Sequence, residues 1–145
     1  MSPAHTASTI VDAPLDVVFA QLCDPARLGR WTLGSMDYQP SGVAGVHVGT
    51  SLFDGATSLV EIRPAPELGI IDYLVGSLEK RIPRVSIRLV AGPDWGLPDT
   101  SCIAAMTTWR AAFMTDERWA RTRTTHELEV LLFKEQIETD WKAGR

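Results

Sequence analysis

Six short, β-rich runs follow one another between residues 34 and 113, and glycine or proline separates them. The runs read "SMDYQP", "VHVGTSLFDG", "TSLVEIRP", "GIIDYLVGS", "RVSIRLVAG" and "SCIAAMTTWRAAF". This spacing favours an antiparallel meander over strands joined by crossover helices. Within "VSIRLVA", Val85, Ile87 and Leu89 alternate with polar residues. The alternation indicates a sheet with one buried and one solvated face, and a second layer must cover the buried face.

The segment from residue 116 onward is the one element long enough to form that layer. Thr115 or Asp116 can cap its start. An apolar stripe continues through it at helical spacing, made by Trp119, Thr122, His126, Val130, Phe133, Ile137 and Trp141. Thr124 and Glu127 also match a capping box, which leaves a helix break as an alternative. We expect one long helix because the stripe runs through that point.

The N-terminal third supplies a further strand and two short helices. "HTASTIVD" is rich in β-branched residues and precedes Pro14, where a helix over "LDVVFAQLC" is expected to start. Asp24 and Pro25 then predict a second short helix that ends near Trp31. The length of 145 residues suits one domain, so we expect residues 1–145 to form a single α+β unit of about seven strands.

The order of elements and several local motifs resemble the START-like, or SRPBCC, superfamily. The stretch "STIVDAPLDVVFAQLCDPARLGRW" is similar to the opening of that family, with Asp24, Pro25 and Trp31 at its Asp-Pro turn and tryptophan. "TSCIAAMTTWRAAF" is similar to its last strand, with Trp109 at a frequent tryptophan. The resemblance implies a helix-grip fold, in which a curved antiparallel sheet wraps around the C-terminal helix. Relatives include polyketide cyclases/dehydrases, lipid-transfer domains, the birch-pollen-allergen group and activators of a heat-shock ATPase. They share no catalytic signature, so the resemblance assigns no catalytic residue.

A curved sheet around one helix leaves a space at its centre, so the fold implies a largely apolar pocket. The candidate ligand-binding residues are Trp31, Met36, Phe53, Tyr73, Ile87, Trp109, Trp119, His126 and Val130. Each of these could also simply pack in the core. For the last strand we expect Trp109 to face inward, because Arg110 would be costly inside without a partner. An arginine that binds a ligand carboxylate would reverse that choice.

His126 is the leading candidate for chemistry because it lies on the inward stripe of the long helix. A histidine there could act as a general base or donate to a ligand carbonyl. Tyr73 is the second candidate, and Asp72, Glu61 and Arg110 are other conceivable partners, but no spacing ties them to His126. We therefore interpret His126 as a polar contact of the pocket wall or a core residue, with catalysis as the alternative.

Composition excludes several function classes. The net charge is −4 and basic residues form no long run, which argues against nucleic acid as a partner. No stretch is apolar enough to cross a membrane, and the N-terminus lacks the pattern of a signal peptide, so we expect a cytoplasmic protein. Cys23 and Cys102 are expected to be reduced, buried thiols. The dispersed histidines predict no metal site, and no phosphate or dinucleotide motif predicts a cofactor.

Three surface features remain open. The cluster "SLEKRIPR" is interpreted as a solvated turn, with contact to an anionic ligand or partner as the alternative. Trp95, in the loop "GPDWGLPD", could form a lid, contact a partner or fold back onto the sheet. Leu128, Leu131 and Leu132 lie off the main helix stripe, and either the short helices or a homodimer partner could cover them.

Three functions are therefore compared. The first is a carrier or sensor that binds a small hydrophobic or aromatic molecule. The second is a cyclase or dehydratase-like enzyme, which needs His126 to meet Tyr73 or a carboxylate across the cavity. The third is a protein-interaction module, which predicts a filled core and an exposed apolar patch.

Overall fold

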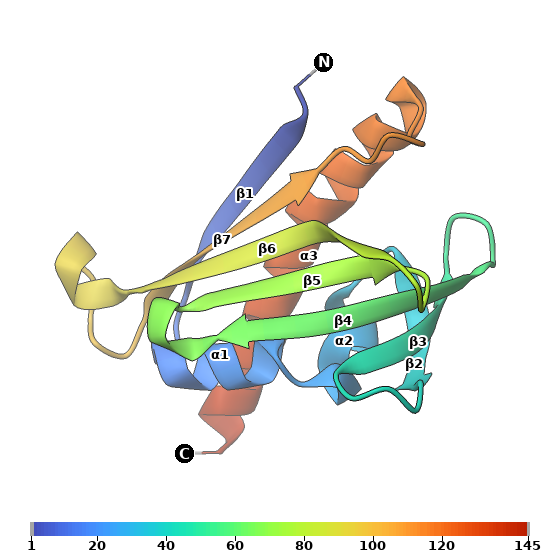
Figure 1. Ribbon diagram of the computed structural model, residues 1–145. Helices are drawn as coiled ribbons and strands as arrows, with labels where there is room; N and C mark the ends of the chain where they lie inside the picture. Colours follow the sequence, from blue (N-terminus) through green and yellow to red (C-terminus); the bar gives the residue numbers. More distant parts are fainter. Residues whose placement is uncertain (1, 145) are drawn as a thin grey trace.

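The computed structural model describes residues 2–144 and shows a seven-stranded antiparallel sheet crossed by a long helix (Figure 1). The N-terminal part contains β1 (Ala4–Val11), α1 (Leu15–Leu22), a 3-10 turn (Pro25–Arg27) and α2 (Leu28–Trp31). The meander consists of β2 (Ser35–Pro40), β3 (Val46–Ser51), β4 (Thr57–Ala65), β5 (Ile70–Gly76), β6 (Arg81–Ala91) and β7 (Cys102–Trp109). Two more 3-10 turns, Pro66–Leu68 and Gly92–Trp95, follow β4 and β6, and α3 (Asp116–Ala143) ends the fold. The α+β class, the meander and the long helix are confirmed.

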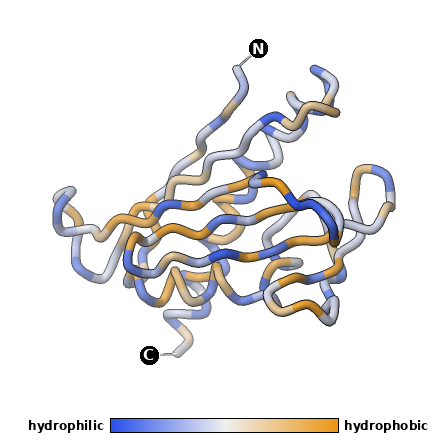
Figure 2. Tube along the Cα trace, in the orientation of Figure 1, coloured by the Kyte–Doolittle hydropathy of each residue, from blue (hydrophilic) through white to orange (hydrophobic). Residues whose placement is uncertain are grey.

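The sheet has the strand order β1-β7-β6-β5-β4-β3-β2, with antiparallel pairing throughout. The first strand therefore pairs with the last, in a register that joins Val11 to Cys102 and Ala4 to Trp109. Apolar and polar positions alternate along the strands, as Figure 2 shows by colour. The layer that covers the apolar face is α3, which packs most closely against β1 and β7. The helix leaves the β2–β5 side of the sheet less closely covered (Figure 1).

α3 is one continuous helix, so the alternative break near Thr124 does not occur. Its start is capped by Thr115, whose side-chain oxygen accepts the backbone N–H of Arg118 at 3.1 Å. The predicted stripe is buried from Trp119 to Ile137, and Trp141 is half-buried. α1 begins at Leu15, one residue later than predicted, with Pro14 as its N-cap.

Aromatic side chains from three elements form the centre of the core. Trp31 of α2 makes edge-to-face contacts with Tyr73 of β5 and Phe133 of α3, with ring centroids 5.8 and 5.6 Å apart. Such contacts add to the burial of apolar area, which makes this trio the anchor between helices and sheet. Trp119 belongs to a second, smaller cluster with Ala111 and Met114.

The expectation that Trp109 faces inward is wrong. Cys102, Ala104, Met106 and Thr108 are the buried residues of β7, while the side chain of Trp109 is 38% exposed. The prediction assumed that Arg110 continues β7 and lies on the face opposite Trp109. Because the strand ends at Trp109, Arg110 does not decide which face of β7 is buried. Arg110 already lies in the loop, where its guanidinium donates to Asp116 at 2.7 Å and leaves the interior free of that charge.

Candidate functional site

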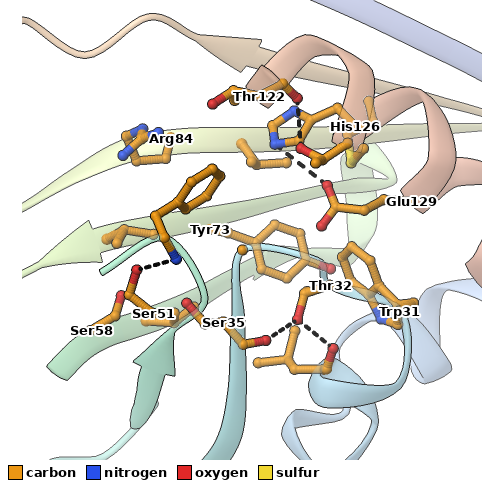
Figure 3. A pocket seen from close by; sticks show the side chains of 18 of the residues that line it. Trp31, Thr32, Ser35, Ser51, Ser58, Tyr73, Arg84, Thr122, His126 and Glu129 are labelled. Atoms are coloured by element: carbon orange, nitrogen blue, oxygen red, sulfur yellow. Dashed lines mark hydrogen bonds and ion pairs between the residues drawn. The ribbon is translucent and has the colours of Figure 1, made fainter. Parts of the chain in front are cut away.

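A cavity of about 150 Å³ lies between α3 and the β4–β6 part of the sheet (Figure 3). The residues that line it come from α2, from the segment that follows it into β2, and from β3 to β7. α3 contributes residues from four successive turns, from Arg118 to Glu129. A volume of roughly 150 Å³ is known to accommodate a single benzene ring. The space therefore suits a molecule built around one ring.

The wall of the cavity combines apolar and polar side chains. Its apolar part includes Trp31, Val60, Tyr73, Val75 and Met106. Its polar part includes the hydroxyl groups of Thr32, Ser35, Ser51, Ser58, Thr122 and Thr125. The wall is therefore mixed, and more polar than that of a typical small-molecule site, in which a few polar groups fix the orientation of the ligand.

His126 and Glu129 meet in the wall of this cavity. Nε2 of His126 lies 3.4 Å from Oε1 of Glu129, and both side chains are almost fully buried (Figure 3). The other ring nitrogen of His126, Nδ1, is buried and has no hydrogen-bond partner among the described residues 2–144. Oε2 of Glu129 accepts the backbone N–H of Leu33 at 2.8 Å. The second carboxylate oxygen thus fixes the side chain while the first faces the imidazole.

Burial favours the uncharged form of each member of this pair. Burial, helped by the nearby charge of Arg84, lowers the pKa of His126 from 6.5 to about 4. Burial also raises the pKa of Glu129 to about 7, against the opposing effect of the Leu33 hydrogen bond. At neutral pH the imidazole is therefore neutral and Glu129 is close to its midpoint. A neutral imidazole and a carboxyl group that titrates near pH 7 can exchange a proton with a bound molecule.

The sequence reasoning missed Glu129 as the partner of His126. The available signal was the spacing of three residues, which places two side chains side by side on a helix. Two of the partners considered instead, Tyr73 and Glu61, are engaged elsewhere. Tyr73 donates its hydroxyl to the carbonyl oxygen of Leu22 at 2.7 Å, and burial raises its pKa well above its ordinary value of 10. Glu61 binds Arg81 on the outside of the sheet.

Arg84 is a second cavity residue that the sequence reasoning missed. Tyr73 pairs with Val85 and Leu74 pairs with Pro83, so Arg84 is the extra residue of a β-bulge in β6. Arg84 and Val85 both line the cavity, which two successive residues of a regular strand do not do. The signal was Pro83, because proline inside a central strand is confined to bulges. The interpretation of "SLEKRIPR" as a solvated turn is wrong for Arg84, the last residue of that cluster.

Another bulge changes which residue of β2 lines the cavity. The register of β2 shifts between Met36 and Gln39, and Asp37 adopts a φ of 55°. Regular alternation would place Met36 and Tyr38 on one face, but only Tyr38 lines the cavity and Met36 is 42% exposed. The ring of Tyr38 packs against Gly49, where a Cβ atom would lie 2.9 Å from the ring.

The nine predicted ligand-binding residues fall into two groups. Trp31, Phe53, Tyr73 and His126 line the cavity. Met36, Ile87, Trp109, Trp119 and Val130 do not: Met36 and Trp109 are on the surface, and Ile87, Trp119 and Val130 are packed in the two core clusters.

Other chemistry finds little support within the described chain. Burial raises the pKa values of Cys23 and Cys102 to about 11, which keeps both thiols protonated and unreactive. Across residues 2–144, no group of three or more metal-ligating side chains converges. None of the helices formed by these residues is long and apolar enough to span a membrane.

Similarity to known proteins is found at the level of three-dimensional structure. No family model and no curated protein sequence matches the chain. The Zhui aromatase/cyclase from Streptomyces sp. R1128 has a TM-score of 0.66 and 15% identity, over 93% of each chain. The Aha1 dimer from Colwellia psychrerythraea has a TM-score of 0.65 and 16% identity, over 95% of this chain and 97% of that one.

A third similar structure is the di-domain aromatase/cyclase StfQ from the steffimycin biosynthetic pathway. Its TM-score is 0.64 at 14% identity, and the match covers 95% of this chain but 46% of StfQ. At such low identity the likeness establishes the fold and nothing about activity. The helix-grip fold that the resemblance implied is therefore confirmed.

Proposed function

We propose that the cavity between α3 and the sheet binds a small hydrophobic or aromatic molecule, and that the protein is its carrier or sensor. The observation that supports this function is the space of about 150 Å³, whose wall combines apolar and aromatic side chains with polar groups. A core that served stability alone would be close-packed, since interiors rarely leave voids larger than a water molecule.

Native mass spectrometry with a cavity-filling variant tests this proposal. Val75 lines the cavity, so Val75→Phe places a ring in the space that a ligand would occupy. Val90 of the neighbouring strand is half-buried and does not line the cavity, so Val90→Phe is the matched control. We expect the wild type and Val90→Phe to retain added phenol or indole, and Val75→Phe to lose it. Equal retention by all three proteins, or retention by none, would reject the proposal.

Acid–base catalysis on the bound molecule is the second candidate, and the His126–Glu129 contact favours it. A neutral imidazole could take a proton from carbon next to a carbonyl and leave an enolate. The carboxylate of Glu129 would then stabilise the imidazolium formed. This is the kind of step that a cyclase or dehydratase-like enzyme needs. Tyr73 has no part in it, because its hydroxyl is held by Leu22.

Deuterium exchange distinguishes the enzyme from the carrier. Acetylacetone in D2O loses its acidic C–H signal in proton NMR spectra, and we expect the wild-type protein to accelerate this loss if it is an enzyme. His126→Gln and Glu129→Gln should abolish the acceleration, while Glu135→Gln, at an exposed position of the same helix, should keep it. If the protein binds acetylacetone but deuterium exchange is no faster than in buffer alone, the enzyme function is rejected and the carrier function is retained.

A homodimer is also a proposal. α1 and α2 leave Leu128 and Leu131 exposed, at 49% and 56%, and one similar solved structure is a dimer. Sedimentation of the wild type and of Leu131→Glu tests this proposal. A dimer that dissociates in the variant supports it, and a monomeric wild type contradicts it. The interaction-module function on its own is disfavoured, because it predicts a filled core.

A further inference from the structure

Two arginines line the cavity without forming a salt bridge to a carboxylate. Arg84 comes from the bulge of β6 and Arg118 from the first turn of α3. Within residues 2–144 neither guanidinium forms a salt bridge or a hydrogen bond, and Nε of each is buried without a partner. Both side chains are half-buried, and a guanidinium that is partly removed from water is normally stabilised by an anionic partner.

The two guanidinium groups share one aromatic ring. The central carbon of Arg84 lies 5.5 Å from the ring centroid of Phe113, and that of Arg118 lies 4.8 Å from the same centroid. Arg118 also lies 4.9 Å from the centroid of Phe53, which lines the cavity. Cation–π contacts hold both side chains in place but do not neutralise their charges. Burial and the charge of Arg118 together lower the pKa of Arg84.

The carboxylates around this pair are committed to other groups. Asp54 is fully exposed and accepts the backbone N–H of Ala56 at 2.9 Å; the charge of Arg118 helps to lower the pKa of Asp54, but the two groups form no salt bridge. Glu129 lines the same cavity, but it accepts the N–H of Leu33 and faces His126. The cavity therefore has a positively charged part at the arginines and a part at His126 and Glu129 that can exchange protons.

We propose that the ligand is a single-ring aromatic carboxylate, with its carboxylate bound by Arg84 and Arg118 and its ring in the apolar part of the cavity. This inference rests on the proposed function and specifies its ligand class. A guanidinium matches the planar, two-oxygen geometry of a carboxylate. The volume of about 150 Å³ limits the remainder of the molecule to about one ring.

Calorimetric titration with three probes of similar size and different charge tests the inference. The probes are benzoate, benzyl alcohol and benzylamine. We expect the wild type to bind benzoate most tightly and benzylamine least. Arg84→Gln and Arg118→Gln should each weaken benzoate binding by roughly 10- to 100-fold, the range for hydrogen bonds to charged groups. Both variants should bind benzyl alcohol as the wild type does, which also shows that their cavity is intact.

Arg88→Gln is the matched control, because Arg88 lies on the same strand as Arg84 but is exposed and does not line the cavity. It should bind benzoate like the wild type. Benzoate binding no tighter than benzyl alcohol binding, or an equal loss in Arg88→Gln, would overturn the inference and leave the proposed function standing. Failure of all three probes to bind would reject the proposed function itself. If one arginine variant does not fold, the other still decides between these outcomes.

Discussion

Replacing Glu129 by glutamine should change how the stability of the protein depends on pH. The side chain is buried in the cavity wall, and its carboxyl group accepts one backbone N–H, from Leu33. Glutamine has nearly the same shape and keeps a carbonyl oxygen for that hydrogen bond. The substitution therefore removes the titration of the side chain while it changes the packing little.

The magnitude follows from the pKa of Glu129, which burial raises from 4.5 to about 7. Below pH 4.5 the group is protonated in both the folded and the unfolded chain, so it causes no penalty. Between pH 4.5 and 7 the unfolded chain loses its proton first, and the free energy of unfolding falls as pH rises. Above pH 7 the full penalty, about 3 kcal/mol, is present. Glu129→Gln has no such penalty, because glutamine does not ionise.

Urea unfolding of the wild type and of Glu129→Gln at pH 4.5 and pH 8 measures the effect. The variant should gain about 3 kcal/mol of unfolding free energy relative to the wild type between these two pH values. Glu135→Gln, at an exposed position of the same helix, should show no comparable gain. A difference between Glu129→Gln and the wild type that does not change with pH would refute the reasoning, since the carboxyl group would then titrate alike in the folded and unfolded chain.

Three further substitutions test the titration of His126 and the contacts around the cavity. Burial lowers the pKa of His126 from 6.5 to about 4, so the wild type should lose about 3 kcal/mol of stability as pH falls through that window. His126→Gln should lack this loss in urea titrations, and an unchanged pH profile would count against it. Tyr73→Phe leaves the carbonyl of Leu22 without its donor and should lower the unfolding free energy by about 1–3 kcal/mol, whereas an unaltered melting temperature would mean that water replaces the hydroxyl. Gly49→Ala places a Cβ atom 2.9 Å from the ring of Tyr38 and should destabilise by about 1–3 kcal/mol in urea unfolding. A neutral result there would show that the ring moves aside freely.

The fold could be predicted because it follows from periodicity. Alternation in the meander and the long stripe of α3 are repeated signals, and each repetition indicates the same buried layer. Trp31, Tyr73 and His126 could be placed at the cavity for the same reason, since each lies on the inward face of a regular element.

The remaining site residues depend on interruptions of that periodicity. Arg84 and Tyr38 line the cavity where bulges shift the register of β6 and β2. Trp109 follows the regular alternation of β7 and is at the surface; it was misplaced because Arg110, beyond the end of the strand, was counted in that alternation. A bulge inserts one residue and reverses the phase of the alternation, so an alternation that is assumed to be regular places the residues beyond the bulge on the wrong face. Glu129 was missed because a glutamate is not expected among the buried residues of a helix. Its burial is explained only by its partners, His126 and the backbone N–H of Leu33, which the sequence does not reveal.

The most direct test of the ligand site is a titration of 15N-labelled protein with benzoate, followed by amide chemical shifts in NMR spectra. The account predicts shifts at cavity residues of two facing elements, such as Val75 in β5 and His126 in α3, and none at exposed Leu131 or Trp95. The same titration of Val75→Phe should leave these amides unshifted. Shifts that gather around Leu131 or Trp95, or that persist in Val75→Phe, would contradict a binding site between the helix and the sheet.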